Sequence, residues 1–427
     1  MNICVVALGK IGLPLAVQFA SKGHKVIGAD VAKRVVDLVN EGVPPFPGEA
    51  DLDVKLKQAV DAGLLSATTD TTAAVRESDA AVVVVPLFVD AEGVPDFEWM
   101  DDATRAIAAG MRPGTLVSYE TTLPVGTTRD RWAPMLAEGS GLTAGEDFFV
   151  AFSPERVFTG RVFADLRRYP KLVGGIDAAS AEKAVALYEA VLDFDERDDL
   201  PRPNGVWDVG SAEASELAKL AETTYRDVNI GLANQFARYA DTIDVDITKV
   251  IEACNTQPFS HIHQPGIAVG GHCIPIYPRM YLWNDPAATV VRSAREANAG
   301  MPEYAISLLA EAYGDLKGAS VLVLGAAYRG GAKETAFSGV FPTVEALRER
   351  GATPYVSDPM YTAEELTSLG LPAHQGEQVT AAVVQADHAE YRSLSAKDLP
   401  GVRVLVDGRR VTDPAHWDGV TRVVIGG

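Results

Sequence analysis

The first residues of the chain constrain its fold more than any other segment. An apolar run, Ile3–Leu8, leads into Ala-Leu-Gly-Lys-Ile-Gly at 7–12, a helical stretch and a second apolar run, Lys25–Ala29, that ends at Asp30. The two glycines let a pyrophosphate approach the backbone and a helix pack closely on a strand. A carboxylate at the end of the second strand accepts ribose hydroxyls and repels a 2′-phosphate. The segment predicts a β-α-β unit that binds NAD rather than NADP. Alanine replaces the usual first glycine, and a purely structural turn is the alternative.

Further apolar runs extend this unit into a sheet. Ala80–Pro86, Thr115–Tyr119 and Phe148–Phe152 are apolar, and helical segments alternate with the strands. Such runs are typical of parallel strands that are buried on both faces.

The pattern changes near Ser211, where a long helix begins. Its apolar residues recur at helical spacing and predict a buried stripe, which consists of Leu217, Leu220, Ala221, Thr224, Val228 and Leu232. A loop rich in glycine and proline, 258–278, follows, and a helical stretch over 293–313 comes after it.

A second α/β region opens at Ser320. Short apolar runs predict its strands, which are Val321–Leu324, Thr353–Ser357, Ala381–Val384 and Arg403–Asp407. Strands that alternate with helices favour parallel sheets. We therefore predict an α/β fold of two Rossmann-like, doubly wound parallel-sheet domains joined by a long helical connector. The domain boundaries are expected at 1–200, 201–315 and 316–427.

Charge and cysteine content exclude several classes of protein. A formal net charge of −20 disfavours nucleic acid and anionic membranes as partners. No apolar run reaches the roughly 18 residues that span a bilayer, and the N-terminus lacks the basic segment of a signal peptide.

Three cysteines, an odd number without metal-ligand spacing, argue against disulfides and a metal site. We expect a cytoplasmic protein.

Cys273 is the candidate nucleophile. It lies in the run Gly-Gly-His-Cys-Ile-Pro at 270–275, which is poor core material and suits a tight exposed turn. A thiol on such a turn can hold a carbonyl as a thiohemiacetal, and a nicotinamide can oxidise that adduct to a thioester. The alternative is a buried structural cysteine, which is how we interpret Cys4 and Cys254.

Two further motifs directly follow strands, at the edge of a parallel sheet where ligands bind. The first is 120–128, in which a hydroxyl such as that of Thr122 could orient the nicotinamide or a catalytic water. It could also be an N-cap and turn cluster. The second is 153–157, in which Glu155 could assist hydrolysis or could simply form a surface pair with Arg156.

A third group of polar residues lies on the long helix. Lys219, Thr223 and Arg226 follow one another at i, i+4 and i+7, on one face. A lysine that points into a pocket could stabilise an alkoxide or donate a proton. The alternative is a solvated polar face.

Taken in order, these motifs resemble the nucleotide-sugar 6-dehydrogenases, the UDP-glucose and UDP-N-acetylhexosamine dehydrogenase family. The resemblance runs from Met1 to about Asp358. The segments that carry it are 9–14, 120–128, 153–157, 225–234, 270–275 and 325–329.

The resemblance implies a four-electron, NAD-dependent oxidation at carbon 6 of a UDP-hexose. Cys273 would capture the aldehyde as a thiohemiacetal, whose oxidation gives a thioester, and water would release the uronate. Lys219 matches the lysine that stabilises the oxyanion, and Glu155 and Thr122 match residues that support the water and the cofactor. Relatives are homodimers or larger, with the connector helix at the interface, so we expect a homodimer. Their C-terminal domain binds the UDP.

The binding residues follow from the same resemblance. For the cofactor they are Gly9, Lys10, Ile11, Gly12, Asp30, Pro86 and Thr122. For the UDP-sugar they are Arg156, Val157, Lys219, Thr223, Arg226, Gly270, Tyr328 and Arg329.

The chain departs from the family pattern at three positions. Thr223 replaces the usual asparagine, Tyr277 an aspartate that is expected beside the catalytic water, and Ala336 an arginine that contacts UDP. The thiol, the lysine and the acid all remain, so we expect an active enzyme. The departures also motivate the alternative of a catalytically impaired nucleotide-sugar-binding protein. A two-electron hydroxyacid dehydrogenase is a further alternative, but it has no use for Cys273.

The sequence leaves the hexose open between two branches. His-Cys-Ile-Pro at 272–275 resembles the aminohexose branch, whereas Gln257 and Phe259 stand where N-acetylmannosamine enzymes place basic residues. We favour UDP-glucose, oxidised to UDP-glucuronate. UDP-N-acetylhexosamine, either ManNAc or GlcNAc, is the alternative.

Overall fold

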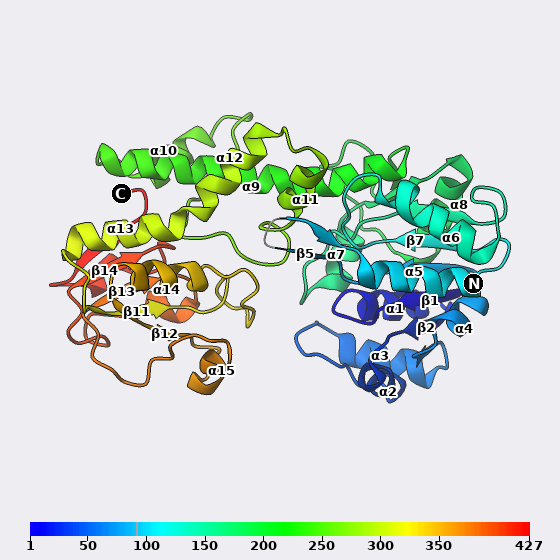
Figure 1. The fold of residues 1–427 in the computed structure, drawn as a ribbon, viewed down its shortest axis with the longest axis horizontal. Helices are drawn as coiled ribbons and strands as arrows, with labels where there is room; N and C mark the ends of the chain where they lie inside the picture. Colours follow the sequence, from blue (N-terminus) through cyan, green and yellow to red (C-terminus); the bar gives the residue numbers. More distant parts are fainter. Residues whose placement is uncertain (91–92) are drawn as a thin grey trace. The chain divides into compact units, whose positions relative to one another are not determined.

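The computed structural model describes residues 1–90 and 93–427 (Figure 1). The chain divides into two compact units, Met1–Ala221 and Glu222–Gly427. Each unit contains a sheet with apolar clusters on both faces. The two predicted Rossmann-like folds are confirmed.

The first unit is built on an eight-stranded sheet in the order β10-β9-β8-β7-β4-β1-β2-β3. Its strands are β1 (Asn2–Val6), β2 (Lys25–Ala29), β3 (Leu65–Thr68), β4 (Ala80–Val83), β7 (Leu116–Tyr119), β8 (Phe149–Phe152), β9 (Lys171–Gly175) and β10 (Val206–Asp208). Neighbouring strands are parallel except β8 and β9, which are antiparallel. The sequence did not predict β3, β9 or β10, because their runs are short and contain polar residues or glycines.

Helices cover both faces of this sheet, as a doubly wound fold requires. One face packs against α1 (Gly12–Ser21), α3 (Leu52–Asp61), α7 (Val162–Arg168) and α8 (Ala178–Val191). The other packs against α4 (Thr71–Arg76), α5 (Glu98–Gly110) and α6 (Ala133–Ser140). The remaining elements are α2 (Lys33–Asn40), a π-helical turn (Thr127–Trp132) and the small hairpin of β5 (Phe88–Val89) and β6 (Pro95–Asp96).

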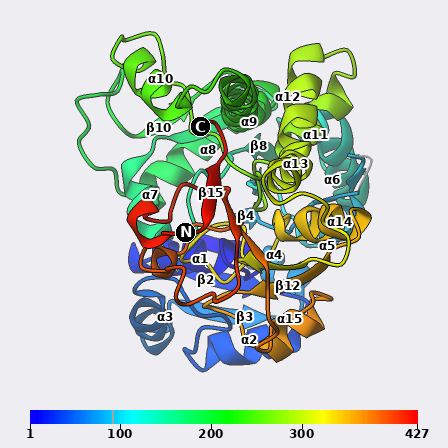
Figure 2. The same cartoon turned by 90° about the vertical axis from the view of Figure 1, so that its left-hand side faces the viewer.

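The long helix is α9 (Ala212–Thr242), seen end-on in Figure 2. The helix is confirmed, but its predicted buried stripe is only partly right: Leu220 and Thr224 are buried, whereas Leu217, Ala221 and Leu232 are exposed. The buried positions carry mostly small or polar side chains, namely Ser215, Glu216, Lys219, Leu220, Thr223, Thr224, Asp227, Ala233, Asn234 and Ala237. Both faces have the same period, so periodicity alone could not decide which one is inside.

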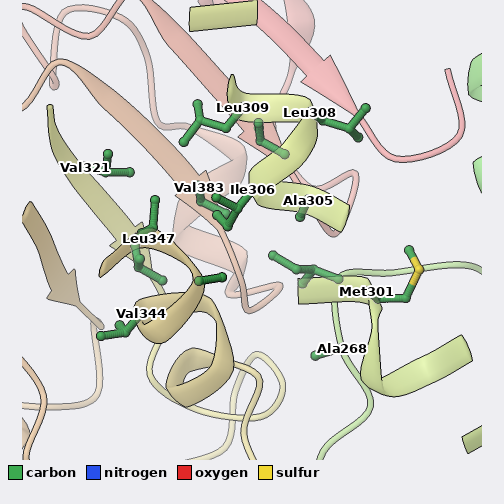
Figure 3. Close-up of a cluster of buried hydrophobic side chains, with 14 of the residues drawn as sticks. Ala268, Met301, Ala305, Ile306, Leu308, Leu309, Val321, Val344, Leu347 and Val383 are labelled. Carbon is green, nitrogen blue, oxygen red and sulfur yellow. The ribbon is translucent and has the colours of Figure 1, made fainter. Parts of the chain in front are cut away.

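The second unit contains a parallel five-stranded sheet in the order β12-β11-β13-β14-β15. Its strands are β11 (Ser320–Leu324), β12 (Thr353–Ser357), β13 (Ala381–Val384), β14 (Val404–Asp407) and β15 (Thr421–Val424), of which β15 was not predicted. Helices α13 (Met301–Tyr313) and α14 (Val340–Glu349) pack on one face. Figure 3 shows part of this cluster, in which Ile306 lies beside Val383.

The remaining helices of the second unit are α10 (Ile247–Cys254), α11 (Tyr277–Asn284), α12 (Thr289–Ala299) and α15 (Ala363–Ser368). The helical stretch expected over 293–313 is two helices, because α12 ends before Gly300 and α13 begins with Met301 and Pro302. Within the described residues, no helix is long and apolar enough to cross a membrane.

Candidate active site

The turn between β1 and α1 leaves no room for a side chain at Gly12. A Cβ there would lie 1.9 Å from the carbonyl oxygen of Ala7. Gly9 is different, because it is exposed and a Cβ there would meet no atom within 4 Å. Packing therefore requires glycine at 12, whereas the surface over Gly9 is open to a ligand.

Asp30 lies at the end of β2 and holds this turn. Its Oδ2 accepts the Leu8 N–H at 2.8 Å, and its Oδ1 accepts the Ala32 N–H at 2.8 Å. Each carboxylate oxygen has a second lone pair, so both ribose hydroxyls can still be accepted. An open glycine backbone, a helix N-terminus and this carboxylate together fit a dinucleotide.

Ala7 has a φ of 75°, in the left-handed region. This conformation costs a residue with a Cβ about 1–2 kcal/mol, which explains why glycine is usual at this position. Replacing Ala7 with glycine removes this cost, but the greater entropy of glycine in the unfolded chain offsets about 0.5–1 kcal/mol of the gain. We therefore expect Ala7→Gly to raise the free energy of unfolding by roughly 0.5 kcal/mol.

Urea denaturation of the variant checks this expectation. Ala73→Gly, in α4, is the matched control and should be destabilised by about 0.5–1 kcal/mol, since its backbone is helical. Equal destabilisation of both variants would contradict the account.

Three neighbouring strands place other predicted residues at the same edge of the sheet. β1, β4 and β7 are adjacent and parallel, so 7–12, Pro86 and Thr122 follow their carboxyl ends. Thr122 is buried, whereas Lys10 and Pro86 are exposed. Parallel strands therefore bring these predicted cofactor residues to one edge of the first unit.

Glu155 follows β8 and forms an ion pair with Lys171, the first residue of β9. Lys171 Nζ also lies 2.9 Å from Oε2 of Glu120. The sequence analysis missed Lys171, because β9 was not recognised, and it assigned Glu120 no role. A lysine at the start of a short apolar run was the signal that the sequence offered.

Arg156 and Val157, the next predicted residues, are half-buried. The Arg156 guanidinium lies 6.0 Å from the centre of the Tyr169 ring, and its Nη1 donates to the Pro170 carbonyl at 3.4 Å. These contacts tie the loop that carries Glu155 and Arg156 to the segment that precedes β9.

Glu216 on α9 is a buried residue that the sequence analysis missed. It accepts the Gly126 N–H at 2.6 Å, the Thr128 N–H at 2.9 Å and the Thr128 hydroxyl at 2.7 Å. Burial raises the pKa of Glu216 to about 7. It fixes the turn that follows Thr122.

The three predicted residues of α9 have different environments. Lys219 and Thr223 are buried, whereas Arg226 is exposed. The solvated-face interpretation is therefore wrong for Lys219 and Thr223. A buried lysine is rare in proteins unless it is paired or functional.

In the second unit, the thiol of Cys273 is exposed, as the composition of its loop predicts. Gly270 and Gly271 lie against Tyr328, and a Cβ on Gly270 would approach the Tyr328 Cβ to 2.6 Å. The Gly271 N–H donates to the carbonyl of Ala336 at 2.9 Å. The loop that carries the thiol is thus packed against the loop after β11, which contains Tyr328 and Arg329.

The backbone at two of the departures from the family pattern takes part in holding this loop. Tyr277 is the first residue of α11, and its N–H donates to the Cys273 carbonyl at 2.9 Å. Ala336 supplies the carbonyl that accepts the Gly271 N–H. Arg329 is exposed, and its Nε donates to the Tyr328 hydroxyl at 3.0 Å.

A buried network behind this loop was not foreseen. Asp227 pairs with Arg295 at 2.6 Å and accepts from Asn298 at 2.8 Å. Asn298 in turn accepts from Asn234, whose Oδ1 receives the Gly266 N–H at 2.9 Å. The network ties α9, α12 and the chain leading to Cys273 together.

No group of three or more His, Cys, Asp or Glu side chains within the described part of the chain is placed to hold a metal ion.

Three segments match domains of one family. Residues 1–192 match the NAD-binding domain of the UDP-glucose/GDP-mannose dehydrogenase family, residues 213–299 its central domain and residues 322–414 its UDP-binding domain.

Similar proteins match nearly the whole chain. A UDP-N-acetyl-D-mannosamine dehydrogenase of Pyrococcus horikoshii is 35% identical over 96% of both chains. An NDP-N-acetyl-D-galactosaminuronic acid dehydrogenase of Ralstonia nicotianae is 32% identical over 96% of this chain and 95% of that protein. The solved structure of the UDP-D-ManNAc dehydrogenase of Pyrococcus horikoshii has a TM-score of 0.89, covering 100% of this chain and 99% of its own at 33% identity. The solved structure of a UDP-glucose dehydrogenase from Pyrobaculum islandicum has a TM-score of 0.86 at 28% identity, and the match covers 100% of this chain and 97% of that chain.

Proposed function

Because the chain belongs to the UDP-glucose/GDP-mannose dehydrogenase family, we propose that it oxidises carbon 6 of a UDP-N-acetylhexosamine, with the ManNAc sugar preferred. It is an NAD-dependent nucleotide-sugar dehydrogenase. The observation that carries the choice of sugar is the similarity to UDP-N-acetyl-D-mannosamine dehydrogenases over nearly the full length. UDP-glucose, which the sequence analysis favoured from Gln257 and Phe259, is less well supported.

The protein groups divide the chemistry among them. The cofactor would lie against Gly9–Gly12 and Asp30, and NAD, when bound, supplies the hydride acceptor. Cys273 attacks the carbon-6 aldehyde and carries the resulting thiohemiacetal and thioester. Lys219 donates to the oxygen on carbon 6, and Glu155 accepts a proton from the water that releases the uronate. The complete reaction consumes one water and two NAD per sugar.

The substrate's nucleotide would be recognised mainly by the second unit. Tyr328 and Arg329 present a ring and a guanidinium side by side, which suits a uracil base and an anionic phosphate. The UDP-binding domain of the family covers these residues. Gly270 and Arg226 are the further contacts we propose in this unit.

A substrate panel tests the choice of sugar. We expect kcat/KM for UDP-N-acetyl-D-mannosamine to exceed that for UDP-glucose by at least about tenfold, because a site built to bond an amide is left unpaired by a sugar without one. UDP-N-acetylglucosamine carries the same amide with the opposite configuration at carbon 2, so it should also be the poorer substrate, because its amide is directed away from those partners. A higher kcat/KM for UDP-glucose would restore the interpretation from the sequence.

We further propose that the enzyme is a homodimer. The exposed face of α9 in the second unit carries large apolar side chains at helical spacing, and Ile243 directly follows the helix. These residues are Tyr225, Leu232, Phe236, Tyr239 and Ile243. An apolar stripe of this kind is typical of a surface that a second copy covers.

Phe236→Asp should weaken the dimer at least about 30-fold, the equivalent of roughly 2 kcal/mol for a buried aromatic anchor. Light scattering across a dilution series measures this change. Val54→Asp is the matched control, because Val54 is exposed on α3 in the first unit. A variant that dimerises like the wild type would exclude this face.

A further inference from the structure

A buried charge cluster stands behind Glu155 in the first unit. Its members are Glu120, which follows β7, Glu155, which follows β8, and Lys171, which opens β9. The exposed fractions of these side chains are 0% for Glu120, 9% for Glu155 and 4% for Lys171. Burying three ionisable groups costs several kcal/mol per ion unless they are paired. A cluster of this kind is therefore a candidate for a functional role.

The antiparallel strand explains how the lysine reaches this edge. β8 and β9 pair at Ala151 with Gly175 and at Phe152 with Gly174, and this register continued brings Glu155 opposite Lys171. In a parallel strand, the first residue would lie at the opposite edge of the sheet. The reversed direction of β9 thus delivers a cation to the edge where ligands bind.

Hydrogen bonds continue from the cluster into the core. The Tyr188 hydroxyl, on α8, donates to Oε1 of Glu120 at 2.5 Å and lies 2.8 Å from the Ser118 hydroxyl. The Lys171 ammonium also lies 4.6 Å from the centre of the Tyr188 ring. The hydrogen bond from Tyr188 thus fixes Glu120 on the side that faces the core. Glu155 has the most exposed side chain of the three cluster members.

The cluster contains two carboxyl groups but only one cation. Burial and the neighbouring Glu155 raise the pKa of Glu120 to about 8, although Lys171 opposes this shift. Burial lowers the pKa of Lys171, but the two carboxylates outweigh it and raise the value above normal. The raised pKa favours the neutral form of Glu120, the more deeply buried of the two carboxyl groups, and the Lys171 ammonium also pairs with Glu155.

We propose that Lys171 and Glu120 are positioning residues that keep Glu155 ionised and fixed as the base for the hydrolytic half of the reaction. This role rests on the proposed function. Lys171 supplies the opposing charge to Glu155, and Glu120, which Tyr188 fixes, holds the Lys171 ammonium in place. When Glu155 accepts a proton from water, the water oxygen bonds to the thioester carbon, the C–S bond breaks, and the Cys273 thiolate leaves as the uronate forms.

The test compares Lys171→Met with Lys171→Arg, which keeps the charge. In Lys171→Met, the acid limb of the kcat–pH profile should move to higher pH by about 1–3 pH units, because a carboxylate without its cation takes up a proton more readily. The thioester adduct on Cys273 should also accumulate, as measured by intact mass after a quench. Lys171→Arg should show the kcat–pH profile of the wild type. Lys183→Met, on α8 and outside the cluster, is the matched control.

The outcomes separate this inference from the proposed function. An unchanged pH profile and no adduct in Lys171→Met, with an active wild type, overturn only the role of the cluster. A wild type that forms no uronate from any UDP-hexose overturns both. If Lys171→Met does not fold, a second measurement tests the inference: the infrared difference spectrum between the wild type and Glu120→Gln at pH 7. A protonated carboxyl band lost in the variant supports the inference, and its absence from the wild type contradicts it.

Discussion

Cys273→Ala should lower uronate formation by on the order of 10³-fold or more, as expected when a covalent nucleophile is removed. The thiol is exposed on a loop that its two glycines and Tyr328 hold in place. NAD affinity should stay largely unchanged, because the substitution leaves the proposed dinucleotide contacts at Gly9–Gly12 and Asp30 intact. Coupled measurement of NADH formation and of the sugar product, together with NAD titration, checks both parts.

Cys254→Ala is the matched control for this variant. Cys254 ends α10 in the same unit and is only half-buried, so its loss should leave turnover within about twofold of wild type, as for substitutions away from a site. Uronate formation at the wild-type rate in Cys273→Ala would rule out the thioester route.

Gly12→Val should lower the stability of the fold, whereas Gly9→Val should leave stability unchanged and weaken NAD binding. At Gly12, a Cβ would lie 1.9 Å from a backbone oxygen that cannot rotate away. Forcing a side chain into such a site costs about 3 kcal/mol, which for a unit of this size lowers the melting temperature by roughly 10 °C. At Gly9, a Cβ meets nothing within 4 Å, so the melting temperature should hold while NAD affinity falls at least about tenfold, the equivalent of 1.4 kcal/mol.

Differential scanning calorimetry with and without NAD distinguishes the two effects. In Gly9→Val the ligand-free transition should match the wild type, and the upward shift produced by NAD should shrink. If both variants lost stability equally, the division between a packing glycine and a ligand-facing glycine would be wrong.

Sequence patterns predicted much of this fold because several independent signals agreed. An apolar strand, a glycine turn and a carboxylate at the end of the next strand occur together in dinucleotide-binding units, so each supported the prediction from the others. The glycines beside Cys273 are poor core residues, which predicted an exposed loop. The antiparallel strand β9 was missed because Lys171 and two glycines disguise a strand of five residues. Strand direction, moreover, is a property of tertiary pairing, so the sequence could not place Lys171 beside Glu155.

The buried face of α9 was predicted only in part, because Leu220 and Thr224 are buried but Leu217 and Leu232 are exposed. Helical periodicity identifies two faces, and hydrophobicity usually selects the buried one. Here Glu216 and Asp227 are buried with hydrogen-bonding partners, while Phe236 and Tyr239 remain exposed. A surface covered by a second copy, as we propose for this face, has the composition of a core, so the proposed homodimer would explain why hydrophobicity did not select the buried face.

The most direct test of the account is to count NADH formed at 340 nm from a limiting amount of UDP-N-acetyl-D-mannosamine with excess NAD. A four-electron oxidation through Cys273 predicts two NADH for each sugar consumed and a carboxylate as the only sugar product. One NADH per sugar with an aldehyde released would contradict the thioester mechanism. No NADH despite tight binding of the UDP-sugar would show a binding protein instead of an enzyme.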